Sequence, residues 1–366
     1  MPSTPPDGEG ASMIWWSGRH PPADPATSFA GKTVLITGAN TGLGFSAALK
    51  FAVLGASRLI FGVRSLQRGE AARDKICQQT GYDKNNIRLY EVDMSTFDSV
   101  KTFGDAVSKE PRIDIAILNA GVVSPSFRLS PEGYEMCLQV MVLSTALMAI
   151  LLLPQLQKSA IISKEPTHLE LVGSIAGRSV KVNPFSKSDA PILDQANQPS
   201  LFGCQRQYQT AKLFLFYILE GLVEETDAAK TNHKGPGVII NMVCPGPCRT
   251  TLGRDFSALL KIPMTLIQMS LFRTAEQGAR SFVSGVTLGL EAHGKFWFSD
   301  MFYEYVFHSK SPCFSADSTY SKGELVTSPE GKALQKKVWQ EIVAILRPHL
   351  PGGELKFSRG MFSVQR

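Results

Sequence analysis

From Lys32 onward the chain alternates short runs of apolar, β-branched residues with longer stretches whose apolar residues recur at helical spacing. The short runs are mostly apolar, as strands buried on both faces of a sheet are. They cover Thr33–Thr37, Arg58–Gly62, Ile87–Val92, Ile113–Leu118, His168–Gly173 and Val238–Val243. Strands that alternate with helices are typical of a parallel sheet covered by helices on both faces. We therefore predict an α/β fold with one doubly wound parallel sheet of six or seven strands.

The flanking segments differ from this pattern. Residues 1–30 are rich in Pro, Gly and Ser, which predicts a mobile N-terminal arm, because proline removes backbone donors and restricts its neighbours. Trp15 and Trp16 within it are large apolar rings that we expect to dock on the body or on a partner. The chain shows no internal repeat, so we predict one domain over 31–310 and a C-terminal extension over 311–366. Ser328-Pro329 begins a predicted helix near 329–347.

Composition and charge exclude several classes of protein. The chain has 366 residues, 43% of them hydrophobic and 19% charged, which is typical of a globular protein. Its net charge of +6 is spread along the chain without a dense basic run, so we expect no nucleic-acid partner. The six histidines are scattered and Cys244 and Cys248 have no matching second pair, so we expect no metal site.

The longest apolar stretch and the first residues bear on location. Leu138–Leu153 contains Gln139, Ser144 and Thr145 and is shorter than the roughly 20 residues that a bilayer requires. We interpret it as a core helix and expect no transmembrane segment. The first residues lack the features of a signal or transit peptide, and the six cysteines form no secreted-type framework. We therefore expect a cytoplasmic protein.

A glycine-rich turn joins the first predicted strand to an apolar helical stretch, Phe45–Leu54. Glycines allow the backbone to turn tightly and to approach a pyrophosphate, whose charge is met by free N–H groups at the helix start. Because a strand precedes the turn and a helix follows it, the turn predicts a Rossmann-type dinucleotide site rather than a plain tight turn. The residues expected to contact the nucleotide are Gly38, Asn40, Thr41, Gly42, Leu43 and Gly44.

The ends of the next strands indicate which dinucleotide binds. The second strand is followed by Arg64, and no acidic residue stands there to bind a free ribose 2′-hydroxyl. The arginine fork suits a 2′-phosphate, which favours NADP(H) over NAD(H), with Ser65 and Arg68 as possible helpers. The alternative is a solvated surface arginine. Two further strand ends point toward the same dinucleotide site. They are Asp93 and Met94, where an adenine ring would lie, and Asn119, Ala120 and Gly121.

Ser174, Tyr208 and Lys212 form a candidate catalytic set. Tyr208 and Lys212 are four residues apart, so they share one face of a helix that we expect to begin near Tyr208. The lysine charge would lower the pKa of the phenol and make it a usable acid or base near neutral pH, while Ser174 orients a substrate oxygen.

These motifs, in this order and followed by Asn241-x-Val243-x-Pro245-Gly246, resemble the short-chain dehydrogenase/reductase family over residues 31–290. Gly31-Lys32, Arg64–Glu70 and Arg273–Gly278 resemble its retinol-dehydrogenase-like branch in filamentous fungi. The resemblance implies that Tyr208 donates or accepts the proton, Ser174 holds the carbonyl oxygen, and Lys212 holds the nicotinamide ribose. It also implies that the loop of Pro245, Gly246 and Thr250 binds the cofactor, with Thr250 touching the carboxamide. The resemblance implies a homodimer through the helix containing Leu138–Leu153 and the helix beginning at Tyr208, with core packing as the alternative for their apolar faces.

The chain departs from the family pattern in two places. Met141 stands where the family has a fourth catalytic residue, an asparagine whose helix holds a water next to the lysine. A thioether is only a weak acceptor, and Ser144 is a candidate holder of a substitute water. The second departure is an insertion, 179–207, before Tyr208, which either shapes specificity or is a surface loop.

The expected function follows from these residues and from the resemblance. We predict an NADP(H)-dependent reductase or dehydrogenase acting on a carbonyl or alcohol of a small molecule in fungal specialised metabolism. A stretch rich in apolar residues occupies 251–273, where the family has its substrate lid, and implies an apolar substrate. Helix packing or a dimer contact is the alternative for this stretch. The alternative for the whole protein is a non-redox cyclase, isomerase or binding protein, because Met141 interrupts the family's proton path.

Overall fold

The computed structural model describes residues 11–180, 185, 188–228, 237–250, 252, 268–269, 271–302 and 324–353. Within them, one sheet of eight strands has the order β3-β2-β1-β4-β5-β6-β7-β8. The strands are β1 Thr33–Thr37, β2 Arg58–Val63, β3 Ile87–Glu91, β4 Ile115–Leu118, β5 Thr167–Val172, β6 Val238–Cys244, β7 Phe296–Phe298 and β8 Met301–Phe302. Neighbouring strands are parallel except β7 and β8. The predicted parallel sheet is confirmed, and β7 and β8 extend it at one edge.

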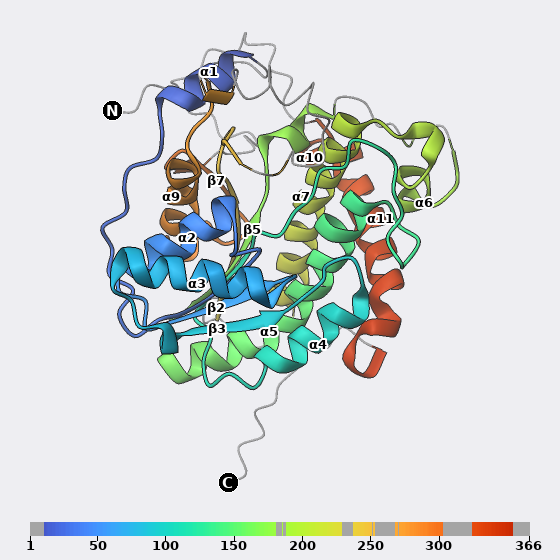
Figure 1. Cartoon of the computed structure of the whole chain (residues 1–366). Coiled ribbons are helices and arrows are strands. Elements are labelled where there is room, and N and C mark those ends of the chain that lie inside the picture. The colour runs from blue at the N-terminus through green and yellow to red at the C-terminus, as the bar shows by residue number, and fades with distance from the viewer. Residues whose placement is uncertain are drawn as a thin grey trace.

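Helices cover both faces of the sheet (Figure 1). On one face lie α2 Gly42–Val53, α3 Leu66–Thr80 and α9 Ala275–Gly285, whose apolar residues form one core cluster with the sheet. On the other lie α4 Phe97–Val107, α5 Ser144–Ser163 and α7 Cys204–Ala228, which form a second cluster. Short 3-10 turns occupy η1 Lys84–Asn86 and η6 Leu290–Ala292. The strand order reverses between β1 and β4, and in such folds a ligand crevice opens there, at the carboxyl ends of the strands.

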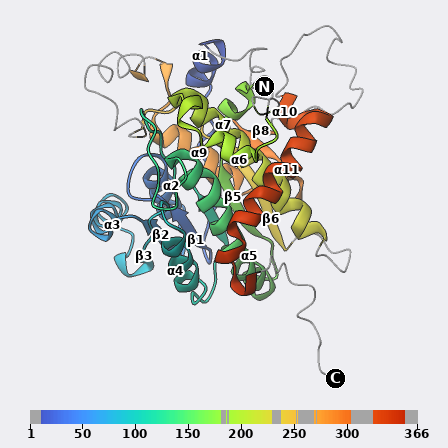
Figure 2. The same ribbon diagram turned by 90° about the vertical axis from the view of Figure 1, so that its right-hand side faces the viewer.

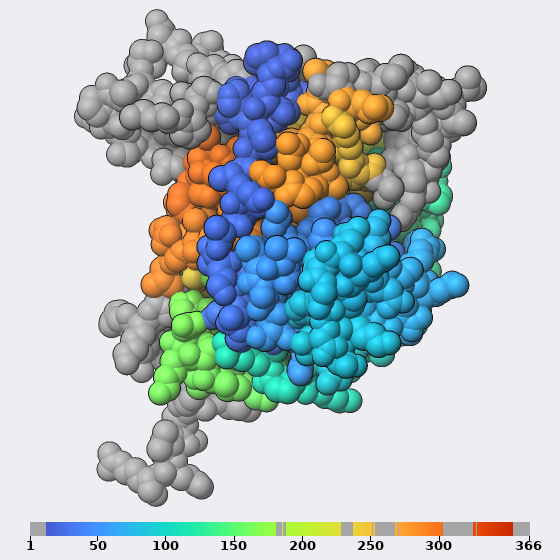
Figure 3. Space-filling view, turned by 60° about the vertical axis from the view of Figure 1, so that its left-hand side comes forward, coloured from blue at the N-terminus to red at the C-terminus, as the bar shows by residue number. Residues whose placement is uncertain are grey.

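The N-terminal segment lies against the body of the protein over its described residues. Residues Ala11–Arg19 form helix α1, in which Trp16 is buried against Phe298 while Trp15 is half exposed. Trp16 therefore docks on the body, as predicted, and Trp15 does not. The following residues run along the surface beside α9 and α2, and Phe29 donates its N–H to the Leu54 carbonyl (Figure 3).

The C-terminal segment packs on α7. It comprises α10 Glu324–Thr327, α11 Pro329–Leu346, η7 Arg347–His349 and η8 Pro351–Gly353. Helix α11 is the helix predicted near 329–347, and the Ser328 hydroxyl caps it by accepting from Gly331 N–H. Its buried face includes Trp339, which lies against Gly221 with no room for a Cβ there. Figure 2 shows α11 crossing in front of α7.

The insertion before α7 has its own short elements. They are η3 Ile175–Ser179, α6 Ile192–Ala196 and η4 Pro199–Leu201. The Glu341 carboxylate of α11 accepts from the N–H groups of Ile192 and Leu193, both at 2.9 Å. Asn197 accepts from Glu135 N–H and donates to Gly133 O. The described part of the insertion is therefore held between α11 and the segment that leads into α5.

The predicted core helix is divided into a π segment, η2 Leu138–Leu143, and the α-helix α5. By length and composition the continuous stretch Leu138–Ser163 is apolar enough to cross a membrane, but 89% of its most apolar window is buried inside the fold. Burial of this kind is what a core helix shows, because its apolar residues face neighbouring elements of the same protein.

Candidate active site

The glycine turn between β1 and α2 has the geometry of an anion site. Gly38 and Gly42 have positive φ angles of 69° and 58°, which favour glycine. Thr41 is the N-cap of α2, yet its side chain makes no capping hydrogen bond and the first turn holds no acidic residue. The N–H groups of this turn are therefore left to bind a phosphate. A Cβ on Gly44 would lie 2.5 Å from Gly38 O, so Gly44 closes the turn from behind.

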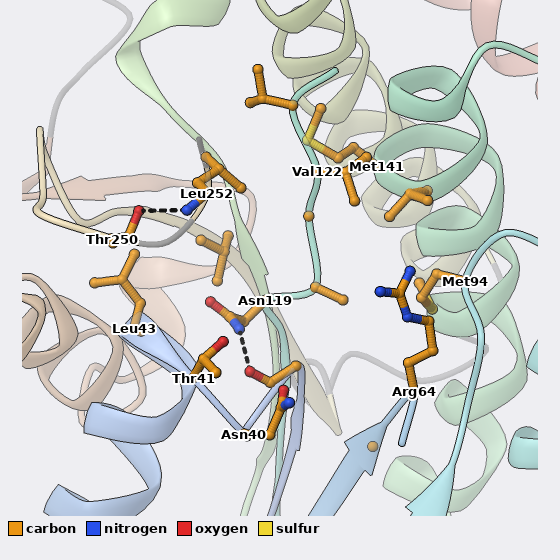
Figure 4. Close-up of a pocket in the computed structure, with 18 of the residues that line it drawn as sticks. Asn40, Thr41, Leu43, Arg64, Met94, Asn119, Val122, Met141, Thr250 and Leu252 are labelled. Atoms are coloured by element: carbon orange, nitrogen blue, oxygen red, sulfur yellow. Dashed lines mark hydrogen bonds between the residues drawn. The ribbon is translucent and has the colours of Figure 1, made fainter. Parts of the chain in front are cut away.

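A cavity opens beside this turn at the carboxyl edge of the sheet (Figure 4). Its lining includes fifteen of the predicted residues: Gly38, Asn40, Thr41, Gly42, Leu43, Arg64, Asp93, Met94, Asn119, Ala120, Gly121, Tyr208, Lys212, Pro245 and Thr250. Gly44, Ser174 and Gly246 were predicted with them and do not line the cavity. The structure thus brings together at one edge segments that lie up to about two hundred residues apart in the chain.

One end of the cavity carries Arg64 and Met94, which lie near each other in Figure 4. Arg64 is exposed at the end of β2. Asp93 fixes the neighbouring loop, because its carboxylate accepts from Ser95 N–H at 2.9 Å. The Ser65 hydroxyl caps α3 by accepting from Arg68 N–H at 3.4 Å. Of the three residues predicted to meet a 2′-phosphate, only Arg64 lines the cavity.

Asn119 holds the floor of the cavity together. Its side-chain Nδ2 donates to Thr37 O at 2.8 Å, and the N–H groups of Asn119 and Ala120 both donate to Thr37 Oγ1 at 3.0 Å. These bonds tie the end of β4 to the end of β1, directly beneath the glycine turn. The Asn-Ala-Gly strand end therefore fixes the shape of the dinucleotide crevice.

Tyr208 and Lys212 project from α7 toward the end of β5. The helix begins at Cys204, one turn earlier than predicted, so both residues lie within regular helix. Lys212 Nζ donates to Val172 O at 2.8 Å and lies 5.7 Å from the centroid of the Tyr208 ring. Ser174 lowers the pKa of the Tyr208 phenol, so its hydroxyl acts on that group. The same hydroxyl accepts from Ala176 N–H at 3.1 Å, and Ser174 does not line the cavity. The three predicted catalytic residues therefore lie together at the end of β5.

The pKa of Tyr208 is shifted opposite to the direction predicted from the lysine charge. Burial raises the pKa of the Tyr208 phenol, and the hydrogen bond from Ser174 only partly offsets this. Burial also lowers the pKa of Lys212 to about 8. Loss of water thus outweighs the attraction between the two groups, because desolvation disfavours both the phenolate and the ammonium.

Met141 lines the cavity from the π segment η2 and is almost fully buried. The irregular turn persists although no asparagine is present. The Thr145 hydroxyl donates to Val140 O at 2.9 Å, and the Glu135 carboxylate accepts from Cys137 N–H at 2.8 Å. Ser144, the predicted holder of a substitute water, uses its hydroxyl proton within the fold, because Ser144 Oγ donates to Met94 O at 2.7 Å. Ser144 also accepts from Gln139 Nε2 and does not line the cavity.

The loop after β6 closes the other end of the cavity. Pro245 and Thr250 line it, and the Thr250 side chain lies 3.8 Å from the position of a Cβ on Gly42. Gly246 has a φ of 73° and faces Ser17 of α1 instead of the cavity. The predicted substrate lid, 251–273, lies outside the described residues except for 252, 268–269 and 271–273.

Sequence reasoning missed most of the apolar part of the cavity wall. Beside Met141 this part is formed by Val122, Val123, Met136, Val140 and Val172, and by Leu252, which belongs to the predicted lid. The signal that could have found Val122 and Val123 is their place directly after Asn119-Ala120-Gly121, at the same sheet edge. The side chains from η2 carry no such signal, because only the π turn directs them inward. Among the described residues, no cluster of His, Cys, Asp and Glu could hold a metal ion.

The fold and the site together define a nicotinamide-dependent oxidoreductase scaffold, and comparisons with known proteins agree. Residues 32–180 match the short chain dehydrogenase family. The short-chain dehydrogenase/reductase ffsI of Aspergillus flavipes is 45% identical over 344 residues, which cover 94% of each chain. The short-chain dehydrogenase/reductase phmF of Phaeosphaeria nodorum is 45% identical over 329 residues, 90% of each chain. The chain belongs to the short-chain dehydrogenase/reductase family.

Solved structures share the fold. A short-chain dehydrogenase from Sphingobium yanoikuyae in complex with NADPH aligns with a TM-score of 0.51 and 21% identity, over 69% of this chain and 84% of that one. The RhlG/NADP active-site complex of Pseudomonas aeruginosa aligns with a TM-score of 0.55 and 20% identity, over 75% and 96%. At these identities the likeness bears on the fold alone.

Proposed function

We propose that this protein is an NADP(H)-dependent reductase that acts on the carbonyl group of an apolar small molecule, with alcohol oxidation as the reverse reaction. The observation that carries the proposal is the convergence of Ser174, Tyr208 and Lys212 beside a cavity that starts at an anion-binding glycine turn. The similarity to fungal enzymes supports a setting in fungal specialised metabolism, and a cytoplasmic location is part of the proposal.

The residues present fit a dinucleotide. The uncapped start of α2 suits a pyrophosphate, and Arg64 stands at one end of the cavity while Thr250 stands at the other. The guanidinium at the Arg64 end suits a 2′-phosphate, which supports NADP(H) over NAD(H). When bound, the nicotinamide supplies or accepts the hydride.

The chain's own residues then handle the oxygen and the proton. The Tyr208 hydroxyl donates its proton to the carbonyl oxygen as that oxygen gains charge, and Ser174 holds the phenol in position. The Lys212 ammonium stabilises the phenolate that remains. A phenol whose pKa is raised by burial is protonated at neutral pH, which favours reduction over oxidation.

Met141 is compatible with turnover on this account. The family's asparagine bends its helix, and here the π turn of η2 bends it without an amide. Met136, Val140 and Met141 also make this wall of the cavity apolar, which suits a hydrocarbon-rich substrate.

The test is oxidation of NADPH, followed by its absorbance, with a panel of apolar ketones and aldehydes. We expect the wild-type protein to oxidise NADPH in preference to NADH and Tyr208→Phe to lose this activity while still binding NADPH. The matched control is Tyr82→Phe, which removes a hydroxyl bonded to Ala56 O outside the cavity lining and should leave turnover unchanged. Tight NADPH binding without turnover of any substrate would favour a non-redox role.

A further inference from the structure

Arg273 is a fully buried arginine whose four side-chain hydrogen bonds to described residues all go to neutral oxygen atoms. Nε donates to Ser17 O at 2.7 Å, Nη1 to Pro245 O at 3.0 Å, and Nη2 to His20 O at 2.7 Å and to Ser299 Oγ at 2.5 Å. Burying a charge is costly unless hydrogen bonds satisfy it, and here backbone carbonyls provide most of them. One side chain thus joins α1, the loop after β6 and the loop after β7.

The backbone of Arg273 is tied to the same loop after β6. Arg273 N–H donates to Pro247 O and Arg249 N–H donates to Arg273 O, both at 2.9 Å. Arg273 therefore hydrogen-bonds to the loop of residues 245–250 through its main chain and to α1 through its side chain. Pro245 and Thr250, the first and last residues of that loop, line the cavity.

The contact between α1 and these segments leaves no free space. A Cβ on Gly246 would lie 2.7 Å from Ser17 Oγ and 2.8 Å from Arg273 Nη1. A Cβ on Gly18 would lie 2.1 Å from Leu271 O. Trp16 stacks on His20 at 4.7 Å between ring centroids and packs on Phe298, the ring over which the Arg273 guanidinium lies. Figure 3 shows the segment that contains α1 lying on the part of the chain that contains α9.

We propose that α1 and Arg273 together hold the loop 245–250 in place at the Thr250 end of the cavity and so position the nicotinamide end of the dinucleotide. We call this arrangement of α1 and Arg273 the clamp. The identity of the ligand rests on the proposed function. The mechanical link between α1 and the loop 245–250 does not. The clamp makes the N-terminal segment part of the cofactor site and Arg273 a positioning residue. We expect the clamp to act on the Thr250 end of the cavity, because among the described residues the side-chain hydrogen bonds of Arg273 go to Ser17, His20, Pro245 and Ser299 and none goes to Arg64 or the glycine turn.

The first experiment uses two variants that weaken the clamp without changing the cavity lining. Gly18→Ala adds one carbon that must push α1 away from Leu271. Arg273→Met removes the guanidinium and its hydrogen bonds and keeps an unbranched side chain of similar length. Ser12→Ala, on the exposed side of α1, is the control. The probes are NADPH and ADP-ribose 2′-phosphate, which lacks the nicotinamide, and the readout is the Kd by calorimetry.

We expect each clamp variant to weaken NADPH binding about tenfold, because the loop that positions the nicotinamide end is no longer held in place, and to leave the shorter ligand within about twofold of wild type. Equal loss for both ligands, or no loss for either, would overturn the clamp, since the first indicates general destabilisation and the second a packing role only.

Hydrogen exchange of the full-length protein without ligand separates the clamp from the function. We expect backbone N–H groups in 245–250 to exchange faster in Gly18→Ala than in Ser12→Ala, with those of α4 unchanged. Unchanged exchange in the loop would refute the link. If the wild type does not bind NADPH but the loop exchanges faster in Gly18→Ala, the proposed function and the ligand assigned to the clamp are refuted. The mechanical link between α1 and the loop 245–250 then stands.

Discussion

Lys212 sets the expected pH dependence at the residue scale. Burial lowers its pKa to about 8, so the ammonium predominates below that pH and the neutral amine above it. Burial raises the pKa of Tyr208, so the phenol stays protonated across this range. We expect kcat/KM for carbonyl reduction to be level up to about pH 7 and to fall about tenfold per pH unit well above pH 8.

A matched variant tests this assignment. Arginine keeps its charge at every pH used, so Lys212→Arg should lose the alkaline fall in kcat/KM, whatever its absolute rate. A wild-type rate that rises through pH 8, or an alkaline fall that persists in Lys212→Arg, would show that another group controls the profile.

Arg64 carries the expected cofactor preference. We expect Arg64→Gln to raise the Kd of NADPH by about tenfold to a hundredfold, because a charge-assisted contact with a phosphate contributes about 1.5–3 kcal/mol. The Kd of NADH should change by less than about twofold, since NADH has no 2′-phosphate. Titration of both cofactors measures this, with Arg68→Gln as the control. Parallel weakening of both would contradict a 2′-phosphate contact.

Most of the candidate residues could be predicted because they stand at recognisable spacings within short stretches of the sequence. Tyr208 and Lys212 are one helical turn apart, and the glycine turn lies between a strand and a helix. Arg273 could not be found this way, since its partners Ser17 and His20 lie more than 250 positions away. The direction of the Tyr208 pKa shift was missed for a related reason: burial is a property of the fold, not of the spacing.

At the scale of elements, the π segment η2 is the feature on which the Met141 argument depends. If Thr145 and Glu135 maintain the turn, Met141→Asn should change kcat by less than about threefold, because the helix is already bent. Thr145→Val should reduce kcat/KM further than Met141→Asn and lower stability by about 1 kcal/mol, since Val140 O loses a partner. Steady-state kinetics and urea unfolding measure these effects. A large gain of activity in Met141→Asn would show that the missing amide limits turnover.

The elements that sequence patterns predicted are those with a long apolar repeat. The first six strands and α11 lie where predicted to within a few residues. β7 and β8, of three and two residues, are too short to show a period, and they become strands only by pairing with an existing sheet edge. The π turn has no apolar repeat of its own, and the bonds on either side of it, Ser144 to Met94 O and Glu135 N–H to Asn197, join residues 50 and 62 positions apart in the chain.

At the scale of the whole molecule, α11 covers α7, one of the two helices through which the family resemblance implied a homodimer. Trp339 is the large side chain at that contact. We expect Trp339→Ala to lower the free energy of unfolding by about 3–5 kcal/mol, because a buried aromatic ring leaves a cavity. Trp15→Ala, at a half-exposed ring, should cost less than about 0.5 kcal/mol. Equal effects in denaturant unfolding would show that α11 does not stabilise the domain.

The arrangement of the central strands and helices could be predicted, but the placement of the two terminal segments could not. Alternating strands and helices are enough to predict the doubly wound sheet and the edge where the site lies. How the two terminal segments attach depends on contacts distant in sequence, such as Trp16 on Phe298 and Glu341 on the start of α6. Composition alone predicted a mobile arm, although α1 packs against the loop 245–250.

Deuterium transfer from NADPH to an apolar ketone tests the proposed reduction directly, with both hydrogens at nicotinamide C4 replaced by deuterium because an enzyme transfers only one of the two. The account predicts that mass spectrometry finds the label on the carbinol carbon of the product with the wild type and finds no product with Tyr208→Phe. NADPH that binds but keeps its label with every ketone and aldehyde tried, or product formed equally by Tyr208→Phe, would contradict it.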